Sequence, residues 1–422
     1  MTDQPRRSAG FIVAVGALAY VSAVTQRSTM GIASLAATER FHTNAEQLSM
    51  LAVAQLVVYA AMQIPVGLLL DRYGARALLT VGALTMAAGQ YTVAFAPSLG
   101  IAVAGRMLVG FGDAFTFISM IRLINGWYSG KRASQLQQWL GNGGQFGQIV
   151  SAIPFATLLH LRGWTTAFSV WASIALILGV ASWILIVNEP TKIDRVSVNL
   201  RERISVLRAS IKLPSTQMAF WVHSTTQSST TVVVLLWGVP FLEVAEGLPK
   251  AVVTSILSSF VLVGFVFGLV FGQVCAHRPE WRKPALTFTT VAMLVNWAVL
   301  IAVPSQAPLW LIALWCLFTS INAPASMVAF DYTRQYVPKH ELGAANGFVN
   351  IGGFVATFSM MFIIGLVLDL YRAWYGQSHG EGLYSLNGFR LAFISVLLVI
   401  GSGLILFRLN ESRTVKMSLQ SK

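Results

Sequence analysis

Apolar stretches long enough to cross a lipid bilayer recur along most of this 422-residue chain. A helix that spans the hydrocarbon core needs about 20 mostly apolar residues, because each residue adds about 1.5 Å to its length. Since the bilayer core offers no water to backbone polar groups, such stretches must be helical, and the sequence predicts an all-α membrane protein. Twelve stretches qualify: 10–36, 48–69, 77–96, 100–125, 135–158, 165–187, 218–242, 250–273, 284–303, 308–330, 343–368 and 389–408.

The charge content agrees with a membrane protein and excludes most other classes. Only 11% of the residues are charged, against about 25% in soluble domains. This deficit excludes a cytosolic enzyme, a disordered chain and a disulfide scaffold. A net charge of +13 would indicate nucleic-acid binding in a soluble protein, but here the basic residues lie in short loops between apolar stretches. We therefore expect no nucleic-acid partner.

The distribution of basic residues sets the orientation in the membrane. Of the 29 Lys and Arg residues, 21 fall on the side of the predicted helices that holds the N-terminus, five on the opposite side and three inside helices. The side rich in Lys and Arg faces the cytoplasm. Both termini and the central segment 188–217 are thus predicted to be cytoplasmic, in the cytoplasmic (inner) membrane of the cell. Residues 195–212 fit either an amphipathic surface helix or an ordinary basic linker.

Three pairs of segments indicate an internal repeat. The segment TQRST at 25–29 matches TQSST at 226–230, offset by 201 residues, and the loop at 67–76 has a degenerate copy at 272–278, offset by 205. An Asn-Gly pair at 142–143 recurs at 346–347, offset by 204. Nearly equal offsets predict two six-helix halves. We assign residues 1–187 to the first half, 188–217 to the central loop and 218–422 to the second half with its tail.

The loop after the second predicted helix resembles the signature of the major facilitator superfamily. Its Gly-x-x-x-Asp-Arg-x-Gly-x-Arg pattern is matched by Gly67, Asp71, Arg72, Gly74 and Arg76, and 106–114 is similar to a second family element, Arg-x-x-x-Gly-x-Gly. The resemblance covers essentially the whole chain. It implies a secondary transporter with alternating access to a site between the halves, in which the loop stabilises one conformation. The fold expected is twelve helices in two pseudo-symmetric halves.

Three ionisable residues fall deep within predicted helices, and such residues are costly and usually functional. Arg27 lies in the first helix, and Arg106 and Asp113 lie in the fourth, seven residues apart on one face. Two positive charges and one negative charge leave an excess that an anion would neutralise, and Arg binds carboxylates through two parallel hydrogen bonds. We assign Arg27 to anion binding and Asp113 with Arg106 to proton coupling. A purely structural Arg–Asp network is the alternative.

Neutral polar side chains in the predicted helices supply further candidates for substrate contacts. Gln26 and Gln227 occupy repeat-related positions near mid-membrane, which favours a cavity, whereas Gln63 and Gln90 are more typical of helix packing. The other candidates come from the Gly- and Asn-rich fifth and eleventh helices: Asn142, Gln145 and Asn346.

Other chemistry finds no support in the sequence. No phosphate-binding Gly-x-x-x-x-Gly-Lys-[Ser/Thr] pattern occurs, the six histidines are scattered, and Cys275 and Cys316 lack metal-ligand spacing. We therefore expect no enzyme activity, no cofactor and no metal site.

The residues favour a proton-coupled symporter for a small organic anion that functions as a monomer. The first alternative is a proton antiporter that exports drugs or metabolites, although 141–148 lacks the Gly-Pro signature of many drug antiporters. The second is a transporter-like sensor, although no signalling domain is present.

The predicted topology is testable by cysteine labelling. With Cys275 and Cys316 replaced by Ala, single cysteines introduced at Lys131, Arg203 or Lys283 should react with an impermeant maleimide only from the cytoplasmic side. Cysteines at Arg162 and Lys250 should react only from outside. External labelling at position 203 would contradict both the orientation and the repeat.

Overall fold

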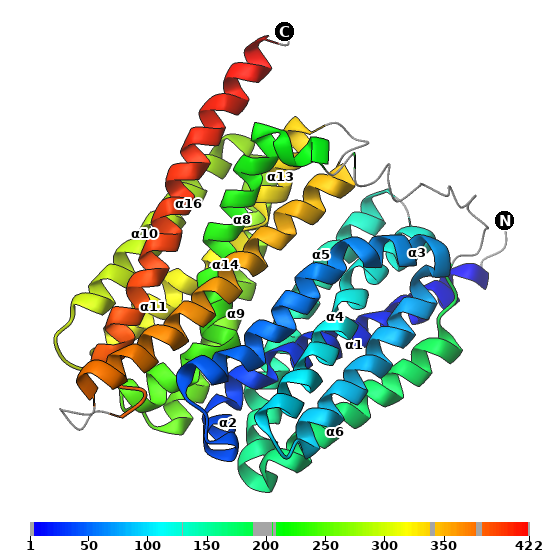
Figure 1. Ribbon diagram of the computed structural model, residues 1–422. Helices are drawn as coiled ribbons and strands as arrows, with labels where there is room; N and C mark the ends of the chain where they lie inside the picture. The colour runs from blue at the N-terminus through cyan, green and yellow to red at the C-terminus, as the bar shows by residue number, and fades with distance from the viewer. Residues whose placement is uncertain are drawn as a thin grey trace. The chain divides into compact units, whose positions relative to one another are not determined.

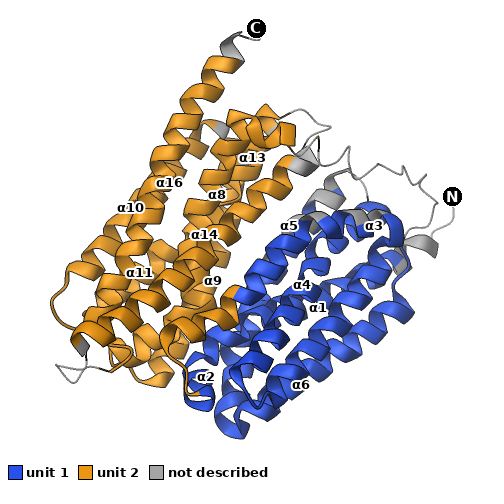
Figure 2. Cartoon of the chain, in the orientation of Figure 1, with its two compact units in different colours: residues 1–41, 54–197 blue, residues 42–53, 198–422 orange. Residues whose placement is uncertain are grey.

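The computed structural model describes residues 4–128, 130–188, 205, 208–337, 342–376 and 382–420. Helices make up nearly all of this part of the chain, as the sequence predicts (Figure 1). The chain divides into two compact units (Figure 2): unit 1 holds 1–41 and 54–197, and unit 2 holds 42–53 and 198–422. The predicted halves and central loop remain a prediction, and most of the segment 195–212 lies outside the described residues.

Unit 1 is built from long helices joined by short turns. They are α1 (Gln4–Ile32), α2 (Ser34–Phe41), α3 (Ala45–Phe95) from residue 54 onward, α4 (Leu99–Trp127), α5 (Gly130–Val150) and α6 (Ala156–Leu185), with the π-helical turn η1 (Ser151–Phe155) before α6. Pro154 explains η1, because proline removes an N–H and widens the turn.

Unit 2 begins with residues 42–53 and continues with α8 (Pro214–Val232). The remaining elements are η2 (Val233–Trp237), η3 (Pro240–Ala245), α9 (Lys250–His277), η4 (Pro279–Trp281), α10 (Arg282–Ala302), α11 (Leu309–Ser320), α12 (Asn322–Ala325), α13 (Val328–Tyr336), α14 (Leu342–Tyr371), η5 (Arg372–Gly376) and α16 (Leu386–Gln420). Within unit 2, the Asp369 carboxylate on α14 accepts hydrogen bonds from the backbone N–H groups of Ala45 and Glu46, at 3.0 and 2.7 Å. The first N–H groups of a helix have no acceptor within the helix, and Asp369 supplies one for these two.

Most predicted spans coincide with helices, and the differences have local causes. Ten helices in the described residues are long and apolar enough to cross a membrane, and one of them, Trp139–Leu185, covers two predicted spans. The first predicted span is divided, since α1 ends at Ile32 and α2 begins at Ser34. The span predicted at 308–330 is divided into α11, α12 and α13, with Pro324 inside α12. Proline lacks the N–H that a continuous helix requires.

Small residues allow α3 and α4 to pack closely. A Cβ atom added to Gly89 would lie 2.7 Å from the Gly105 carbonyl oxygen, and one added to Gly105 would lie 2.8 Å from the Gly89 oxygen. In a membrane, where apolar side chains gain little by leaving lipid, such close backbone contacts are a main source of helix association. This packing fixes the helix that carries Arg106 and Asp113.

The signature loop is a sharp break inside α3. Gly74 has φ 79° and ψ 169°, a region open essentially to glycine alone, while its neighbours on both sides are helical. The backbone N–H of Arg76 donates to Asn188 Oδ1 at 2.7 Å, and the Arg76 guanidinium donates to the Trp183 carbonyl at 2.7 Å. The break thus joins the second half of α3 to the end of α6 within unit 1.

Replacement of Gly74 by alanine should destabilise the protein. The new Cβ would occupy strained backbone and lie 2.5 Å from Asn188 Nδ2, so we expect a loss of about 1–3 kcal/mol and a lower melting temperature in detergent. Gly272→Ala is the matched control, because this glycine is helical and a Cβ there meets nothing within 4 Å. Equal melting temperatures for Gly74→Ala and the wild type would contradict the role of the break.

Candidate functional site

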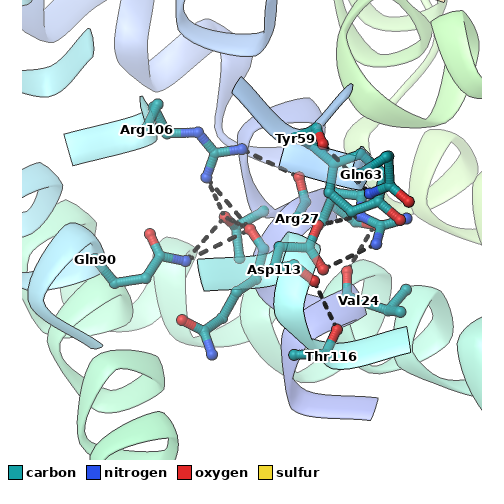
Figure 3. Close-up of polar contacts among 11 residues, drawn as sticks. Val24, Arg27, Tyr59, Gln63, Gln90, Arg106, Asp113 and Thr116 are labelled. Carbon is teal, nitrogen blue, oxygen red and sulfur yellow. Dashed lines mark hydrogen bonds and ion pairs between the residues drawn. The ribbon is translucent and has the colours of Figure 1, made fainter. Parts of the chain in front are cut away.

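Two helices of unit 1 bring the predicted charges together. Arg27 on α1 forms a bidentate ion pair with Asp113 on α4 (Figure 3): Nε donates to Oδ2 at 2.6 Å and Nη2 donates to Oδ1 at 2.8 Å. The two planar groups match, which makes this the strong form of the Arg–carboxylate interaction. The sequence placed Arg27 in the outer half of the first predicted helix and Asp113 near the middle of the fourth, but it did not establish that they pair.

The two partners differ in exposure. The Asp113 side chain is 0% exposed, whereas the Arg27 side chain is 16% exposed. The guanidinium carbon of Arg27 also lies 4.8 Å from the centre of the Tyr59 ring, close enough for a cation–π interaction. The Arg27 side chain therefore keeps some exposed surface, and the Asp113 side chain has none.

Arg106 contacts α1 through the helix backbone. It is 1% exposed, and it donates to the Gln26 carbonyl at 3.3 Å, to the Arg27 carbonyl at 3.1 Å and to Thr29 Oγ1 at 3.3 Å (Figure 3). These contacts hold α1 against α4 and fix the backbone of the residue that pairs with Asp113. The arrangement makes Arg106 a positioning residue, while its assignment to proton coupling stays a prediction.

Other polar groups surround the pair without reaching the surface. Gln90 donates to the Gln26 carbonyl at 3.5 Å and to Thr29 Oγ1 at 3.4 Å, which agrees with its predicted packing role. Gln26 is 1% exposed and its amide donates to Ser22 at 3.1 Å. Gln26 is therefore enclosed in unit 1 here, and its contact with substrate stays a prediction.

Of the two substrate-binding candidates on the fifth predicted helix, the structure describes the side chain of one. Gln145 is half-buried on α5, whereas the side chain of Asn142 lies outside the described residues. Thr25 Oγ1 donates to the Gly147 carbonyl at 2.9 Å and so ties α1 to α5 beside these positions.

In unit 2 the candidates make neutral hydrogen bonds. Gln227 on α8 accepts a hydrogen bond from Ser326 at 3.3 Å and donates to Thr231 at 3.2 Å. Asn346 on α14 accepts one from Thr333 at 2.6 Å. In the repeat alignment Ser228 takes the place of Arg27. The Arg27–Asp113 pair thus belongs to unit 1, and the repeat supplies no arginine at the matching position of unit 2.

The signature residues 67–76 lie within α3, where the sequence predicts a loop, and the only non-helical residue among them is Gly74; their gating role stays a prediction. The Arg76 guanidinium also stacks on the Trp183 ring, 4.5 Å from its centre, and Arg72 lies 5.2 Å from the Tyr73 ring centre. The side chain of Asp71 lies outside the described part, and Gly67 lies half-buried within α3. Sequence reasoning missed Trp183 and Asn188, for which the motif gives no signal. Among the described residues, no group of three or more His, Cys, Asp or Glu could hold a metal ion.

Comparison with known proteins finds membrane transporters. The profile of the Major Facilitator Superfamily matches residues 16–361. The chain is 22% identical over 409 residues to the probable galactarate/D-glucarate transporter GarP of Escherichia coli, covering 89% of this chain and 90% of the relative. It is 21% identical over 378 residues to the probable galactarate/D-glucarate transporter GudP of Bacillus subtilis, covering 81% of each.

A solved structure shares the fold. It is a bacterial homologue of the human lysosomal transporter Spinster in an inward-facing, unoccupied conformation, with a TM-score of 0.80 and 12% identity, covering 96% of this chain and 97% of that one.

The energetic coupling of the buried pair can be measured by a double-mutant cycle. Arg27→Gln should leave the Asp113 carboxylate buried without its partner and cost about 3–5 kcal/mol. Adding Asp113→Asn should recover much of that loss, because a neutral amide does not require the guanidinium. The measurement is thermal unfolding of both single variants and the double variant in detergent, with Arg162→Gln, an exposed arginine, as control. Losses that simply add would show that the two residues are not coupled.

Proposed function

This chain belongs to the Major Facilitator Superfamily, and we propose that it transports a small organic anion of the sugar-acid class together with protons. It is a multi-pass membrane protein and not an enzyme. The cytoplasmic membrane and the inward direction of transport are part of the proposal.

One observation supports the proposal most: the fully buried carboxylate of Asp113 accepts hydrogen bonds through both oxygens from Arg27, whose side chain is partly exposed. A proton on Asp113 removes the negative charge and ends this bidentate pairing. The Arg27 fork then becomes available to a carboxylate of the substrate, which has the same charge and geometry. A proton and an anion are therefore bound together, which is the requirement of symport.

Anion binding without a proton on Asp113 is unfavourable, which supports the same coupling. When Asp113 is ionised, Arg27 is already neutralised, so an incoming anion would have to displace a carboxylate held at 2.6 and 2.8 Å. Displacement would leave an unpaired charge in a fully buried position, which is strongly unfavourable. The anion is thus bound weakly without the proton, and accumulation follows the proton gradient.

The relatives support the substrate class. GarP and GudP are described as probable transporters of galactarate and D-glucarate, and a third relative, from Cupriavidus necator, as a probable sulfoacetate transporter (26% identity over 165 residues, 39% of this chain and 38% of that protein). All three solutes carry acidic groups that a guanidinium binds. Neutral donors such as Gln145, Gln227 and Asn346 suit the hydroxyl groups of a sugar acid.

Uptake by proteoliposomes tests the function directly. Protein reconstituted alone should accumulate labelled D-glucarate when the outside is acidic, and an excess of galactarate should compete. Ethidium, a cationic drug, serves as the antiporter probe. Uptake of neither sugar acid, with ethidium transported against the proton gradient, would replace the proposal with drug export.

Asp113→Asn should separate binding from coupling. Since the amide mimics the protonated carboxyl, this variant should bind D-glucarate and exchange labelled for unlabelled D-glucarate across the membrane. It should not concentrate D-glucarate under a pH gradient. Accumulation equal to that of the wild type would show that another group carries the proton.

Arg27→Lys tests the binding geometry with the charge retained. Lysine lacks the planar fork, so D-glucarate binding should weaken by about 1–3 kcal/mol, measured by the ligand concentration dependence of thermal stabilisation. Arg162→Lys is the control. Unchanged affinity in Arg27→Lys would assign Arg27 a structural role only.

A further inference from the structure

A long groove runs along the surface of unit 2, beside α10, α11 and α16. Its volume is about 680 Å³, and its floor and walls are mainly apolar, with Phe288, Val291 and Val295 from α10 and Phe318 from α11. Figure 1 shows α10 and α16 side by side. A second hollow on α16, lined by Leu404, Ile405 and Leu409, meets the groove at Arg408.

One end of the groove is positively charged. Lys283 and Arg408 both line it, with side chains 49% and 51% exposed. The Glu411 carboxylate lies between them, 2.8 Å from Lys283 Nζ and 3.7 Å from Arg408 Nη1. Glu411 forms ion pairs with both cations and so holds them close together, and the three groups carry a net charge of +1.

The length and exposure of the groove match one leaflet of a bilayer. From Lys283 to Val295 a helix rises about 18 Å, and half of the hydrocarbon core is about 15 Å thick. Phe288 and Val295 are 66% and 53% exposed, as expected of side chains that face lipid. The basic end lies on the side that the Lys and Arg distribution predicts to be cytoplasmic.

We propose that this groove binds an anionic phospholipid of the cytoplasmic leaflet. The phosphate and headgroup lie against Lys283 and Arg408, and one acyl chain follows the apolar walls along α10. A soluble anion would gain nothing from the apolar walls. A zwitterionic lipid would bring its own positive charge close to Lys283 and Arg408. Basic sites between helices on the cytoplasmic side have the chemistry for such headgroups.

The binding test uses purified protein stripped of lipid in detergent. Native mass spectrometry with added phosphatidylglycerol or phosphatidylcholine should show that the wild type retains phosphatidylglycerol preferentially. Sodium phosphate should not compete at millimolar concentration. Lys283→Gln combined with Arg408→Gln should weaken phosphatidylglycerol binding about 25-fold, roughly fivefold for each charge near the membrane surface, and leave phosphatidylcholine binding unchanged.

Three further variants separate charge, shape and general electrostatics. Glu411→Gln should strengthen phosphatidylglycerol binding, because it removes the negative charge and releases both cations. Ala292→Trp should fill the groove and weaken binding without any change of charge, since Ala292 lines it. Arg413→Gln with Lys416→Gln is the matched control, because both residues are exposed on α16 and neither lines the groove.

Two results would overturn the proposal. One is equal retention of phosphatidylglycerol and phosphatidylcholine by the wild type. The other is a loss in the Arg413→Gln/Lys416→Gln control as large as that in the groove variant. Circular dichroism and melting temperature without lipid identify any variant that fails to fold. Glu411→Gln is expected to bind phosphatidylglycerol more tightly, a result that misfolding could not produce. The transport proposal is tested separately, since the lipid-binding assay contains no D-glucarate.

Discussion

A carboxylate buried in a membrane-spanning helix constrains the structure of unit 1 more than any other group. Asp113 has no exposed side-chain surface, and a charge in that position is tolerated only when it is neutralised or paired. Arg27 supplies two charge-assisted hydrogen bonds from α1. The pairing requires α1 and α4 to have a fixed rotation and a fixed height, and Arg106, bonded to the backbone of Gln26 and Arg27, secures both.

The Arg27–Asp113 ion pair also has a role in the transport mechanism that we propose. The Asp113 side chain has no exposed surface, whereas Arg27 is partly exposed beside the Tyr59 ring. In the mechanism that we propose, a substrate carboxylate and Asp113 compete for the Arg27 guanidinium, and protonation of Asp113 favours the substrate. Under this proposal, the ion pair in the structure is the proton-free state of the site, and the structural alternative raised by the sequence remains the competing interpretation.

The sequence was sufficient for the helical fold and for most of the spans, whereas the roles of the candidate site residues stay predictions. Hydropathy located most of the spans because the bilayer sets their length, and the signature pattern contained Gly74, at which the structure breaks α3. The pairing itself could not be predicted, since it depends on how α1 and α4 rotate against each other. Arg106 shows the limit: its spacing from Asp113 suggested a shared role in coupling, yet its hydrogen bonds go to the backbone and a hydroxyl group of α1, which no side-chain pattern reveals.

In the proposed mechanism, substrate binding and protonation of Asp113 are linked, and proton uptake measures that link directly. Weakly buffered protein in detergent, with a pH indicator dye in solution, is mixed with D-glucarate. The wild type should take up close to one proton for each D-glucarate bound where Asp113 is otherwise ionised, and Asp113→Asn should bind D-glucarate with no uptake. Binding by the wild type without proton uptake, or equal uptake by both proteins, would contradict the account.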